Sequence, residues 1–242
     1  MTVFSLKLEI LPAPQLAVWP LLSQVPREFV LYGGTSLALR LGHRQSVDFD
    51  FFSSKDFDPK VLMASIPFLE GGTIAQSERN ALSVWLRPIS GSRTVKMSFF
   101  GGLKIPVLAK PTYLRSNQVV LASILDLAGT KAKVINQRVE LKDYLDIAAF
   151  LDYGMTLPKI VAAAVALYPG MVTDGDTTSA ITYFEEERQN RFRKRSRRSC
   201  GQQPEVPRLP RLPCPSTRPL ERHMLPRDQP RVPSADSGSI SW

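Results

Sequence analysis

Residues 28–52 constrain the fold more than any other part of the chain, because strand-like and helix-like runs alternate within a short stretch. The predicted elements follow one another as a buried strand at 28–32, a tight turn at Gly33-Gly34, a helix at 35–41 and a strand at 46–52. A helix that connects two strands is typical of a sheet covered by helices, in an α/β or α+β fold.

The rest of the sequence extends this arrangement and then becomes helical. Further elements of the first half are predicted as a helix at 15–25 bent at Pro20, a helix at 59–66 capped by Asp58, and strands at 81–86 and 94–100 joined by a hairpin turn at Gly91-Ser92. From residue 122 the apolar spacing predicts helices at 122–137, 142–151, 158–167 and 179–187. We therefore predict an α+β (α/β) fold, with a mixed-sheet core in residues 1–110 and a helical subdomain in residues 111–187.

The C-terminal tail, residues 188–242, differs in kind from the rest. It contains 13 basic and 4 acidic residues, whereas residues 1–187 contain 18 of each, so the tail carries the whole net charge of +9. Nine of the 20 prolines also lie there. Such a segment has too little apolar surface to offset the entropy of ordering, so we predict a disordered tail. Its abrupt change to Arg, Pro and Ser is also typical of out-of-frame translation of GC-rich DNA, which suggests a frameshift.

Composition excludes several other classes of protein. Both cysteines, Cys200 and Cys214, lie in the tail, so neither a disulfide framework nor a cysteine metal site is expected in the core. No run of about 18 apolar residues predicts a transmembrane helix. The N-terminus lacks the basic start and long apolar stretch of a secretory signal. We therefore expect a cytoplasmic protein that contacts no membrane.

Two glycines and two hydroxyl residues mark the start of the helix at 35–41. Gly33 and Gly34 have no Cβ, so the backbone can turn tightly and approach a phosphate closely. Thr35 and Ser36 add hydroxyl donors at a helix N-terminus, where free N–H groups and the helix dipole favour anions. These four residues are predicted to bind the phosphates of a nucleotide.

Two acids, Asp48 and Asp50, lie on the next strand. Because they are two residues apart, both side chains point to one face of the sheet. Carboxylate oxygens are the ligands that Mg²⁺ prefers in proteins. Metal ions held in this way can activate an attacking hydroxyl and stabilise a leaving pyrophosphate. The pair is therefore predicted to bind Mg²⁺ or Mn²⁺ and to support in-line displacement at the α-phosphate of a nucleoside triphosphate.

The diglycine, the helix and the Asp-x-Asp strand together resemble nucleotidyltransferases of the DNA polymerase β type. More closely, they resemble the AbiEii/AbiGii toxin family of type IV toxin–antitoxin systems. The phrase Gly42-His-Arg-x-Ser46 before the acids is similar to members of this family. The resemblance continues in Asp126-Leu-Ala-Gly-Thr-Lys131 and in Lys142-Asp-Tyr-Leu-Asp-Ile147, and it covers roughly residues 28–187.

This resemblance implies roles for residues of the helical half. Lys131 would contact the nucleotide phosphates, and Asp143 or Asp146 would be an acid near the site or the partner of a basic residue. Arg138 lies seven residues from Lys131 on the same helix face, and Arg44 directly precedes the Asp strand, so both are predicted to help bind the nucleotide. The implied substrate is a nucleoside triphosphate, the implied acceptor is an RNA such as tRNA or a protein hydroxyl, and the implied partner is a cognate antitoxin. The product of transfer would block translation.

One departure from the superfamily pattern keeps alternatives open. These enzymes often have a third carboxylate on a neighbouring strand, but the strand at 94–100 has none. Ser98 lies where the acid is expected, with Lys96 on the same face. The chain could therefore be an active transferase, a relative that binds nucleotide without transferring it, or a truncated remnant. A nucleic-acid-binding module that acts through the basic tail is a further alternative.

Four more residues have two interpretations each. His43 is interpreted as a residue that closes a loop, with a general base as the alternative. Trp19, Trp85 and Tyr32 are predicted to lie in the core or at its rim, with base stacking as the alternative, because stacking requires an exposed ring face.

Overall fold

The structure is a computed structural model that describes residues 5–87, 94–138, 140–175 and 177–181. All of these residues belong to a single structural unit, Met1–Arg198. The predicted turn at Gly91-Ser92, the part of the last predicted helix beyond residue 181, and the tail at 188–242 lie outside the described residues.

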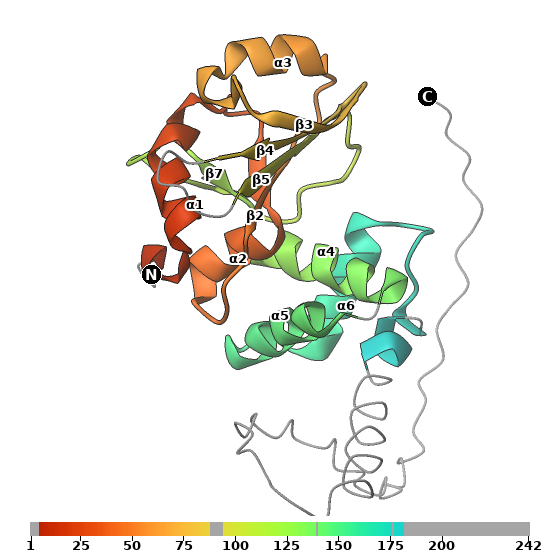
Figure 1. Ribbon diagram of the computed structural model, residues 1–242. Helices are drawn as coiled ribbons and strands as arrows, with labels where there is room; N and C mark the ends of the chain where they lie inside the picture. The colour runs from red at the N-terminus through yellow and green to blue at the C-terminus, as the bar shows by residue number, and fades with distance from the viewer. Residues whose placement is uncertain (1–4, 88–93, 139, 176, 182–242) are drawn as a thin grey trace, which may run out of the picture. The chain divides into compact units, whose positions relative to one another are not determined.

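The described strands form one mixed sheet in the order β3-β4-β5-β2-β1-β7-β6 (Figure 1). They are β1 Val30–Tyr32, β2 Asp48–Phe52, β3 Thr73–Glu78, β4 Ala81–Leu86, β5 Val95–Phe100, β6 Thr112–Tyr113 and β7 Val120–Leu121. In the centre, β2 runs parallel to β5 and antiparallel to β1, which in turn runs parallel to β7. The predicted α+β fold with a mixed sheet is confirmed.

The helices lie close to their predicted positions. They are η1 Leu8–Ile10, α1 Ala13–Val18, η2 Trp19–Gln24, α2 Gly33–Leu41, α3 Pro59–Ser65, η3 Pro67–Leu69, α4 Ile124–Gln137, α5 Leu141–Asp152 and α6 Leu157–Leu167, where η denotes a 3-10 helix. The helix expected at 15–25 changes to a 3-10 helix at Trp19, because Pro20 has no backbone N–H to donate. Helix α3 has the predicted cap, since the Asp58 carboxylate accepts hydrogen bonds from Lys60 N and Val61 N.

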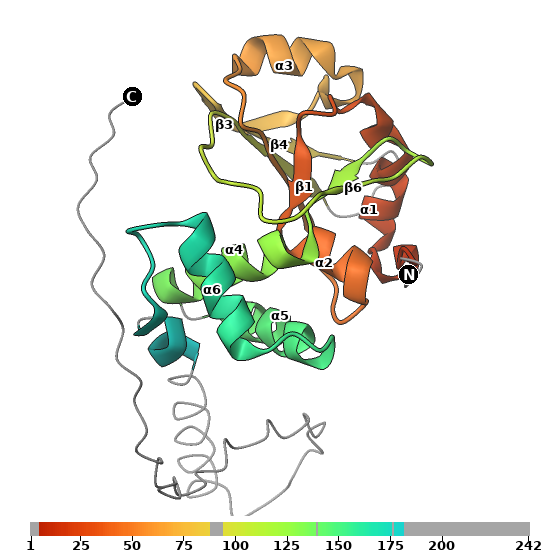
Figure 2. The ribbon, with the colours of Figure 1, turned by 180° about the vertical axis from the view of Figure 1, so that it is seen from behind.

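Two hydrophobic clusters stabilise this unit. The first packs α1, η2, α3 and η3 against one face of the sheet, and Phe49, Phe51 and Phe99 of that face are fully buried. The second joins α4, α5 and α6 around the fully buried Phe150. Helix α2 contributes Leu37 to the second cluster, and its Leu39 packs in the first. The helix that follows the diglycine is therefore fixed on both sides. Figure 2 shows it from behind, between the sheet and the group of α4 to α6.

Membrane-spanning potential is limited to one bent pair of helices. Among the described helices, none is long and apolar enough to cross a membrane alone, and α5 and α6 meet the criteria of length and composition only when taken together, across a bend of 119°.

Candidate active site

Asp48 and Asp50 lie on the face of β2 that points away from the aromatic core. Along this strand the buried Phe49 and Phe51 alternate with the partly exposed aspartates. Both carboxylates therefore share one face of the sheet, as the period of two predicts. Figure 1 shows β2 running next to β5 and leading away from α2.

The diglycine turn lies directly beside the second of these carboxylates. Tyr32, the last residue of β1, pairs with Asp50 across the antiparallel strands, so Gly33 begins α2 next to Asp50. Gly33 has φ +69°, and a Cβ on it would lie 2.6 Å from Asp50 Oδ2. Only glycine combines this backbone conformation with this close approach. The structure thus brings the acid pair and the tight turn together.

Replacing Gly33 by alanine is expected to lower the predicted transfer activity strongly and the folding stability only moderately. Gly71 is a matched control because it also has a left-handed backbone, φ +79°, but a Cβ on it would meet nothing within 4 Å. Both Gly33→Ala and Gly71→Ala should lower the free energy of unfolding by about 1–2 kcal/mol. Only Gly33→Ala displaces Asp50, so it alone should lower the nucleotidyl transfer that the sequence predicts for this acid pair, on the order of 100-fold. Equal transfer rates in the two variants would contradict the role of this contact.

The hydroxyl residues after the diglycine are buried. Thr35 Oγ1 donates a hydrogen bond to the backbone carbonyl oxygen of Asp48, which ties the first turn of α2 to the start of β2. Ser36 is also fully buried, and its Oγ has no hydrogen-bond partner among the described residues. Their predicted contact with phosphates stays a prediction. The observed role of Thr35 is to hold the helix N-terminus against the strand that carries the acids.

The Asp50 carboxylate lies in an environment that disfavours its own charge. Burial, followed by the negative charge of Asp48, raises the pKa of Asp50 above its usual value. The charges of Lys96, Lys131 and Lys142 act in the opposite direction. Two carboxylates held close together in a partly desolvated place favour a bound cation, and oxygen ligands suit a hard divalent ion.

The neighbouring strand β5 presents no acid at this point. Ser98 pairs with Asp50 and Lys96 pairs with Asp48 in the parallel register, as the sequence predicts for this face. Ser98 is buried and its Oγ accepts a hydrogen bond from Ser83 Oγ at 3.2 Å. Among the residues that the structure describes, no group of three or more His, Cys, Asp or Glu side chains could hold a metal ion.

A buried ion-pair network connects the loop before β2 with α4 and α5. Asp146 has a fully buried side chain that accepts hydrogen bonds from Arg44 Nε at 2.6 Å and Arg44 Nη2 at 2.9 Å. Lys131 Nζ lies 2.6 Å from its Oδ2, and His43 Nε2 lies 2.8 Å from its Oδ1. Burial alone would raise the pKa of Asp146, but the hydrogen bonds from His43 and Arg44 and the charge of Lys131 outweigh it and lower the pKa to about 2.

Asp143 forms the second half of this network. Its fully buried carboxylate pairs with Lys131 Nζ at 3.1 Å and with Arg138 Nε at 2.9 Å. Lys131 thus bridges Asp143 and Asp146 of α5 while its charge still reaches Asp50. The structure brings together all residues predicted for the helical half, and it pairs them with one another.

The network also supports the diglycine. A Cβ on Gly34 would lie 2.8 Å from Ser46 Oγ and 2.9 Å from Arg44 Nη2, so the arginine that Asp146 holds passes directly over this glycine. Arg44 is thereby placed between the diglycine turn and the helical half. His43 closes the same loop through Asp146, which agrees with its structural interpretation.

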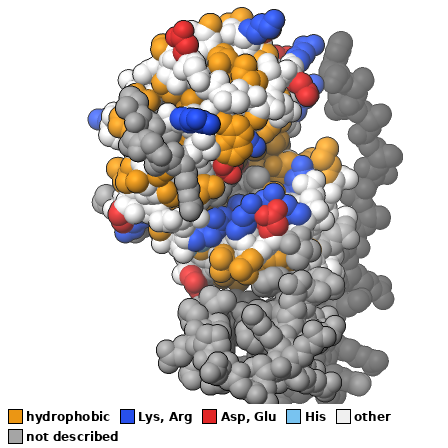
Figure 3. Space-filling view, in the orientation of Figure 1, with side chains coloured by type: hydrophobic (Ala, Val, Ile, Leu, Met, Phe, Trp, Pro, Cys, Tyr) orange, Lys and Arg blue, Asp and Glu red, His pale blue; other side chains and the backbone are white. Residues whose placement is uncertain are grey.

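Lys142 is a basic residue near the acids that sequence analysis did not select. Its charge acts on Asp50, and its side chain is about half exposed. It lies four residues before Asp146 on α5, so helical spacing to the predicted acid was the available signal. In Figure 3, Lys and Arg side chains form a band over the region of α4, next to apolar side chains over the sheet. Such a band favours a polyanionic ligand.

Asp126 anchors the start of α4 instead of entering the site. Ser123 caps the helix by accepting a hydrogen bond from Asp126 N, and its hydroxyl donates to the Asp126 carboxylate. The same carboxylate accepts hydrogen bonds from Leu108 N at 2.8 Å and Ala109 N at 3.3 Å. This buried acid therefore ties the segment after β5 to the helix that carries Lys131.

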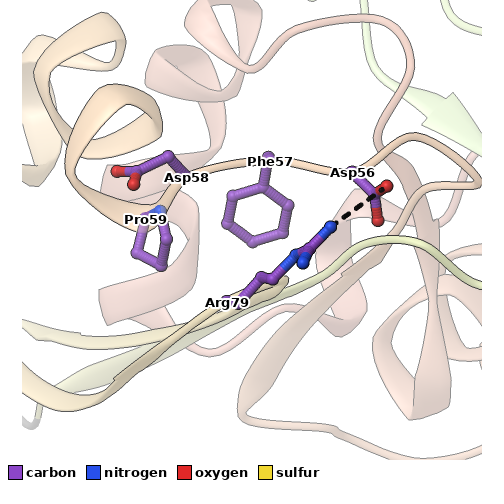
Figure 4. Close-up of a pocket in the computed structure, with 5 residues that line it drawn as sticks. All are labelled: Asp56, Phe57, Asp58, Pro59 and Arg79. Carbon is purple, nitrogen blue, oxygen red and sulfur yellow. Dashed lines mark ion pairs between the residues drawn. The ribbon is translucent and has the colours of Figure 1, made fainter.

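A separate hollow lies at the other end of β2. It has a volume of about 450 Å³ and is lined by Asp56, Phe57, Asp58, Pro59 and Arg79 (Figure 4). Arg79 Nη2 reaches across it to Asp56 Oδ2 at 3.8 Å. Both of these side chains are largely exposed, and none of the predicted site residues lines the hollow. It is therefore distinct from the candidate active site.

Comparison of the sequence with known proteins identifies a family and a relative. The family model described as "Nucleotidyl transferase AbiEii toxin, Type IV TA system" matches residues 21–199. An uncharacterized protein of Aquifex aeolicus (strain VF5) is 30% identical over 165 residues, which are 67% of this chain and 76% of that protein.

Solved structures of nucleotidyltransferases are similar to this one at low sequence identity. MenT4, a nucleotidyltransferase toxin from Mycobacterium tuberculosis H37Rv, is 17% identical with a TM-score of 0.48, over 62% of this chain and 60% of MenT4. A nucleotidyltransferase from H. pylori is 17% identical with a TM-score of 0.44, over 69% of this chain and 88% of that one. An antigenic nucleotidyltransferase-like protein from Paracoccidioides brasiliensis is 19% identical with a TM-score of 0.44, over 68% and 90%. This chain therefore spans about three fifths of the length of MenT4.

Proposed function

Because this chain belongs to the AbiEii nucleotidyltransferase toxin family of type IV toxin–antitoxin systems, we propose that it transfers a nucleoside monophosphate from a nucleoside triphosphate to an RNA such as tRNA, or to a protein hydroxyl. The observation that carries this proposal is the close contact between Gly33 and the Asp50 carboxylate, on the face that Asp50 shares with Asp48.

Asp48 and Asp50 would hold Mg²⁺ or Mn²⁺. The fit is supported by the donor set, since two carboxylates share a face, and by the raised pKa of Asp50, which arises from burial and from the charge of Asp48. When bound, the divalent ion supplies charge stabilisation for the reacting phosphate and for the attacking hydroxyl. The chain's own residues then have to place the triphosphate, neutralise its charge and exclude water.

The first turn of α2 is the proposed phosphate-binding element. Gly33 and Gly34 let the backbone approach the phosphates, and the N-terminus of the nine-residue helix offers free N–H groups and a favourable dipole. Thr35 and Ser36 complete this turn, and Ser36 Oγ, which has no hydrogen-bond partner in the described part of the chain, is a hydroxyl still able to form a hydrogen bond. These groups would orient the α-phosphate for attack.

Basic residues from three elements would neutralise the triphosphate. Lys96 of β5, Lys131 of α4 and Lys142 of α5 all favour the charged form of Asp50, so positive charge from three elements reaches this acid. Arg138 would add to them, because its guanidinium is about half exposed beside Asp143. We propose that Arg44 positions the diglycine turn through its bond with Asp146 and contacts the nucleotide from there.

The proposal also covers the biological setting. A toxin of this family is expected to act on a component of translation, and a separately encoded antitoxin is expected to limit the damage. We further propose that residues 1–110 form the nucleotidyltransferase core and residues 111–187 the helical subdomain. The two hydrophobic clusters support a division into a sheet part and a helical part, but Leu114, Val119 and Leu121 pack in the first cluster, so packing favours a boundary near residue 121.

Transfer of label from a triphosphate is the direct test. The purified chain is incubated with Mg²⁺, each of four α-labelled nucleoside triphosphates and either tRNA or total protein, and the products are separated by gel electrophoresis. We expect label in one acceptor class, and none when Asp48→Ala and Asp50→Ala are combined. Equal labelling by the unmodified chain and this double variant would contradict the proposal.

A nucleotide-binding relative without turnover is the second candidate, and one observation favours it. Ser98 occupies the position beside Asp50 where the superfamily often has a third acid. In that case nucleoside triphosphate and Mg²⁺ would raise the melting temperature of the chain, while no acceptor would become labelled. Labelling above the Asp48→Ala and Asp50→Ala control would exclude this candidate.

A further inference from the structure

One row of side chains runs from the acid pair across the sheet to an exposed tryptophan. Asp48 of β2 pairs with Lys96 of β5, Lys96 pairs with Trp85 of β4, and Trp85 pairs with Thr73 of β3. Residues paired in register point to the same face of a sheet, so all four share the face of the acids. Neighbouring strands lie about 4.8 Å apart, which places the backbone of Trp85 about 10 Å from that of Asp48.

Trp85 is exposed where its neighbours along the strand are not. Its relative exposure is 38%, whereas Val84 and Leu86 are buried on the opposite face. Lys96 Nζ lies 5.9 Å from the centre of its ring, within the range of a cation–π contact. An indole face and a lysine charge are therefore available side by side on the surface that leads to the acids.

The other two aromatic residues considered for base stacking are already engaged. Trp19 is 7% exposed and packs against Phe49 in the first hydrophobic cluster. Tyr32 is stacked on Phe52 at 4.8 Å between ring centroids and is only partly exposed. Trp85 is the aromatic residue of the three whose surface can still accept a flat ligand.

The side chains of this row are suited to bind a single nucleotide, with its base and its phosphate side by side. A flat aromatic ring with a cation beside it suits a nucleobase next to a phosphate, because every base has a π-face and the backbone is anionic. The row also ends at the acids where the phosphate reacts. If Trp85 were only an apolar contact for a protein partner, that role would not require a lysine between Trp85 and the acids.

We infer that Trp85 and Lys96 form a nucleobase-binding subsite beside the reacting phosphate, with the base stacked on Trp85 and its phosphate near Lys96. The choice of ligand class rests on the proposed transferase function. The base belongs either to the bound triphosphate or to the terminal nucleotide of an RNA acceptor. Trp85 would accordingly set the preference for one substrate without taking part in the chemistry.

Binding measured without turnover tests this subsite. The full chain is titrated with a short single-stranded RNA, with an abasic oligonucleotide of equal length, and with a nucleoside triphosphate analogue that cannot be cleaved between the α- and β-phosphates. Trp85→Ala should weaken binding of the RNA or of the analogue by about 5- to 150-fold. Trp85→Phe should retain most of the affinity, because it keeps an aromatic face, and the abasic oligonucleotide should bind Trp85→Ala and the unmodified chain equally.

Two further measurements make the outcome specific. Tyr113→Ala is the matched control, since Tyr113 is 42% exposed on β6 at the far edge of the sheet, and it should bind all probes normally. RNA or the analogue should quench tryptophan fluorescence in the unmodified chain and much less in Trp85→Phe. Loss of RNA affinity assigns the base to the acceptor, and loss of analogue affinity assigns it to the triphosphate.

The inference is overturned if Trp85→Ala binds RNA and analogue as the unmodified chain does, or if it loses abasic binding to the same extent. Circular dichroism of each variant verifies folding. If Trp85→Ala does not fold, the reduced fluorescence quenching expected in Trp85→Phe provides the test. A stacking signal without any label transfer would refute the transferase function and leave the subsite standing. If Trp85→Ala changes neither label transfer nor binding, the transferase function stands and the subsite is refuted.

Discussion

Asp50→Asn is expected to lower nucleotidyl transfer by on the order of 10³-fold while it makes the folded chain more stable. Transfer should fall because asparagine carries no charge for a divalent ion. Stability should rise because the charged form of Asp50 is disfavoured in the fold, first by burial and then by Asp48. A carboxyl group whose pKa is raised on folding costs stability once pH exceeds the ordinary pKa, so its removal stabilises the chain at neutral pH.

Urea unfolding at pH 7 and label transfer, measured on the same preparations, test both halves of this prediction. Asp152→Asn is a suitable control, because Asp152 is an exposed acid at the end of α5, away from the acid pair, and its loss should change neither quantity. As pH falls toward the range where Asp50 is protonated in both states, the stability advantage of Asp50→Asn should shrink. Lower stability together with full activity would show that Asp50 is a structural residue.

The opposition between stability and function explains why this site was visible in the sequence. Asp48 and Asp50 break the apolar run of a central strand, and Gly33 and Gly34 start a helix where other residues form helices better. Both choices are unfavourable for folding alone. The period of two along β2 then fixes which face the acids occupy, so their meeting with the diglycine could be predicted from local spacing.

Other features depended on long-range pairing and were not predicted. Strand β3 is an exposed edge strand without clear alternation, and β6 and β7 contain two residues each, so neither the pattern nor the length marked them as strands. The ion-pair partners of Lys131 could not be predicted either, because Asp143 and Asp146 lie 12 and 15 residues away on another helix. Sequence spacing placed Asp143 and Asp146 on one helix but could not show that both are buried against the same lysine.

Trp85 illustrates a third limit of sequence analysis. Strand periodicity places Trp85 on the opposite face from Val84 and Leu86, but that face can be either covered or open. In this sheet α1 and α3 cover the face of Phe49 and Phe51, and the acid face remains partly exposed over β4 and β5. Only the layer arrangement therefore distinguishes an available indole ring from a buried one.

Asp146→Asn is expected to lower the free energy of unfolding by about 3–5 kcal/mol, because it leaves the buried Arg44 without its counterion and Lys131 with Asp143 alone. Arg44 and Lys131 both pair with this fully buried carboxylate, at 2.6 Å in each case. Urea unfolding at pH 7 measures the loss. Glu140→Gln is the matched control, since Glu140 also pairs with an arginine and a lysine but is exposed, and its loss should have little effect.

The pH dependence of this loss identifies its origin as charge. The pKa of Asp146 is lowered from 3.8 to about 2 in the folded chain, so its charge stabilises the fold above about pH 4, and that stabilisation disappears as pH falls from about 4 to 2. The gap between the unmodified chain and Asp146→Asn should therefore narrow as pH falls below 4. Adding Arg44→Met to Asp146→Asn should restore part of the lost stability, because it removes an unpaired buried cation. A gap independent of pH would show that Asp146 stabilises the chain through packing alone.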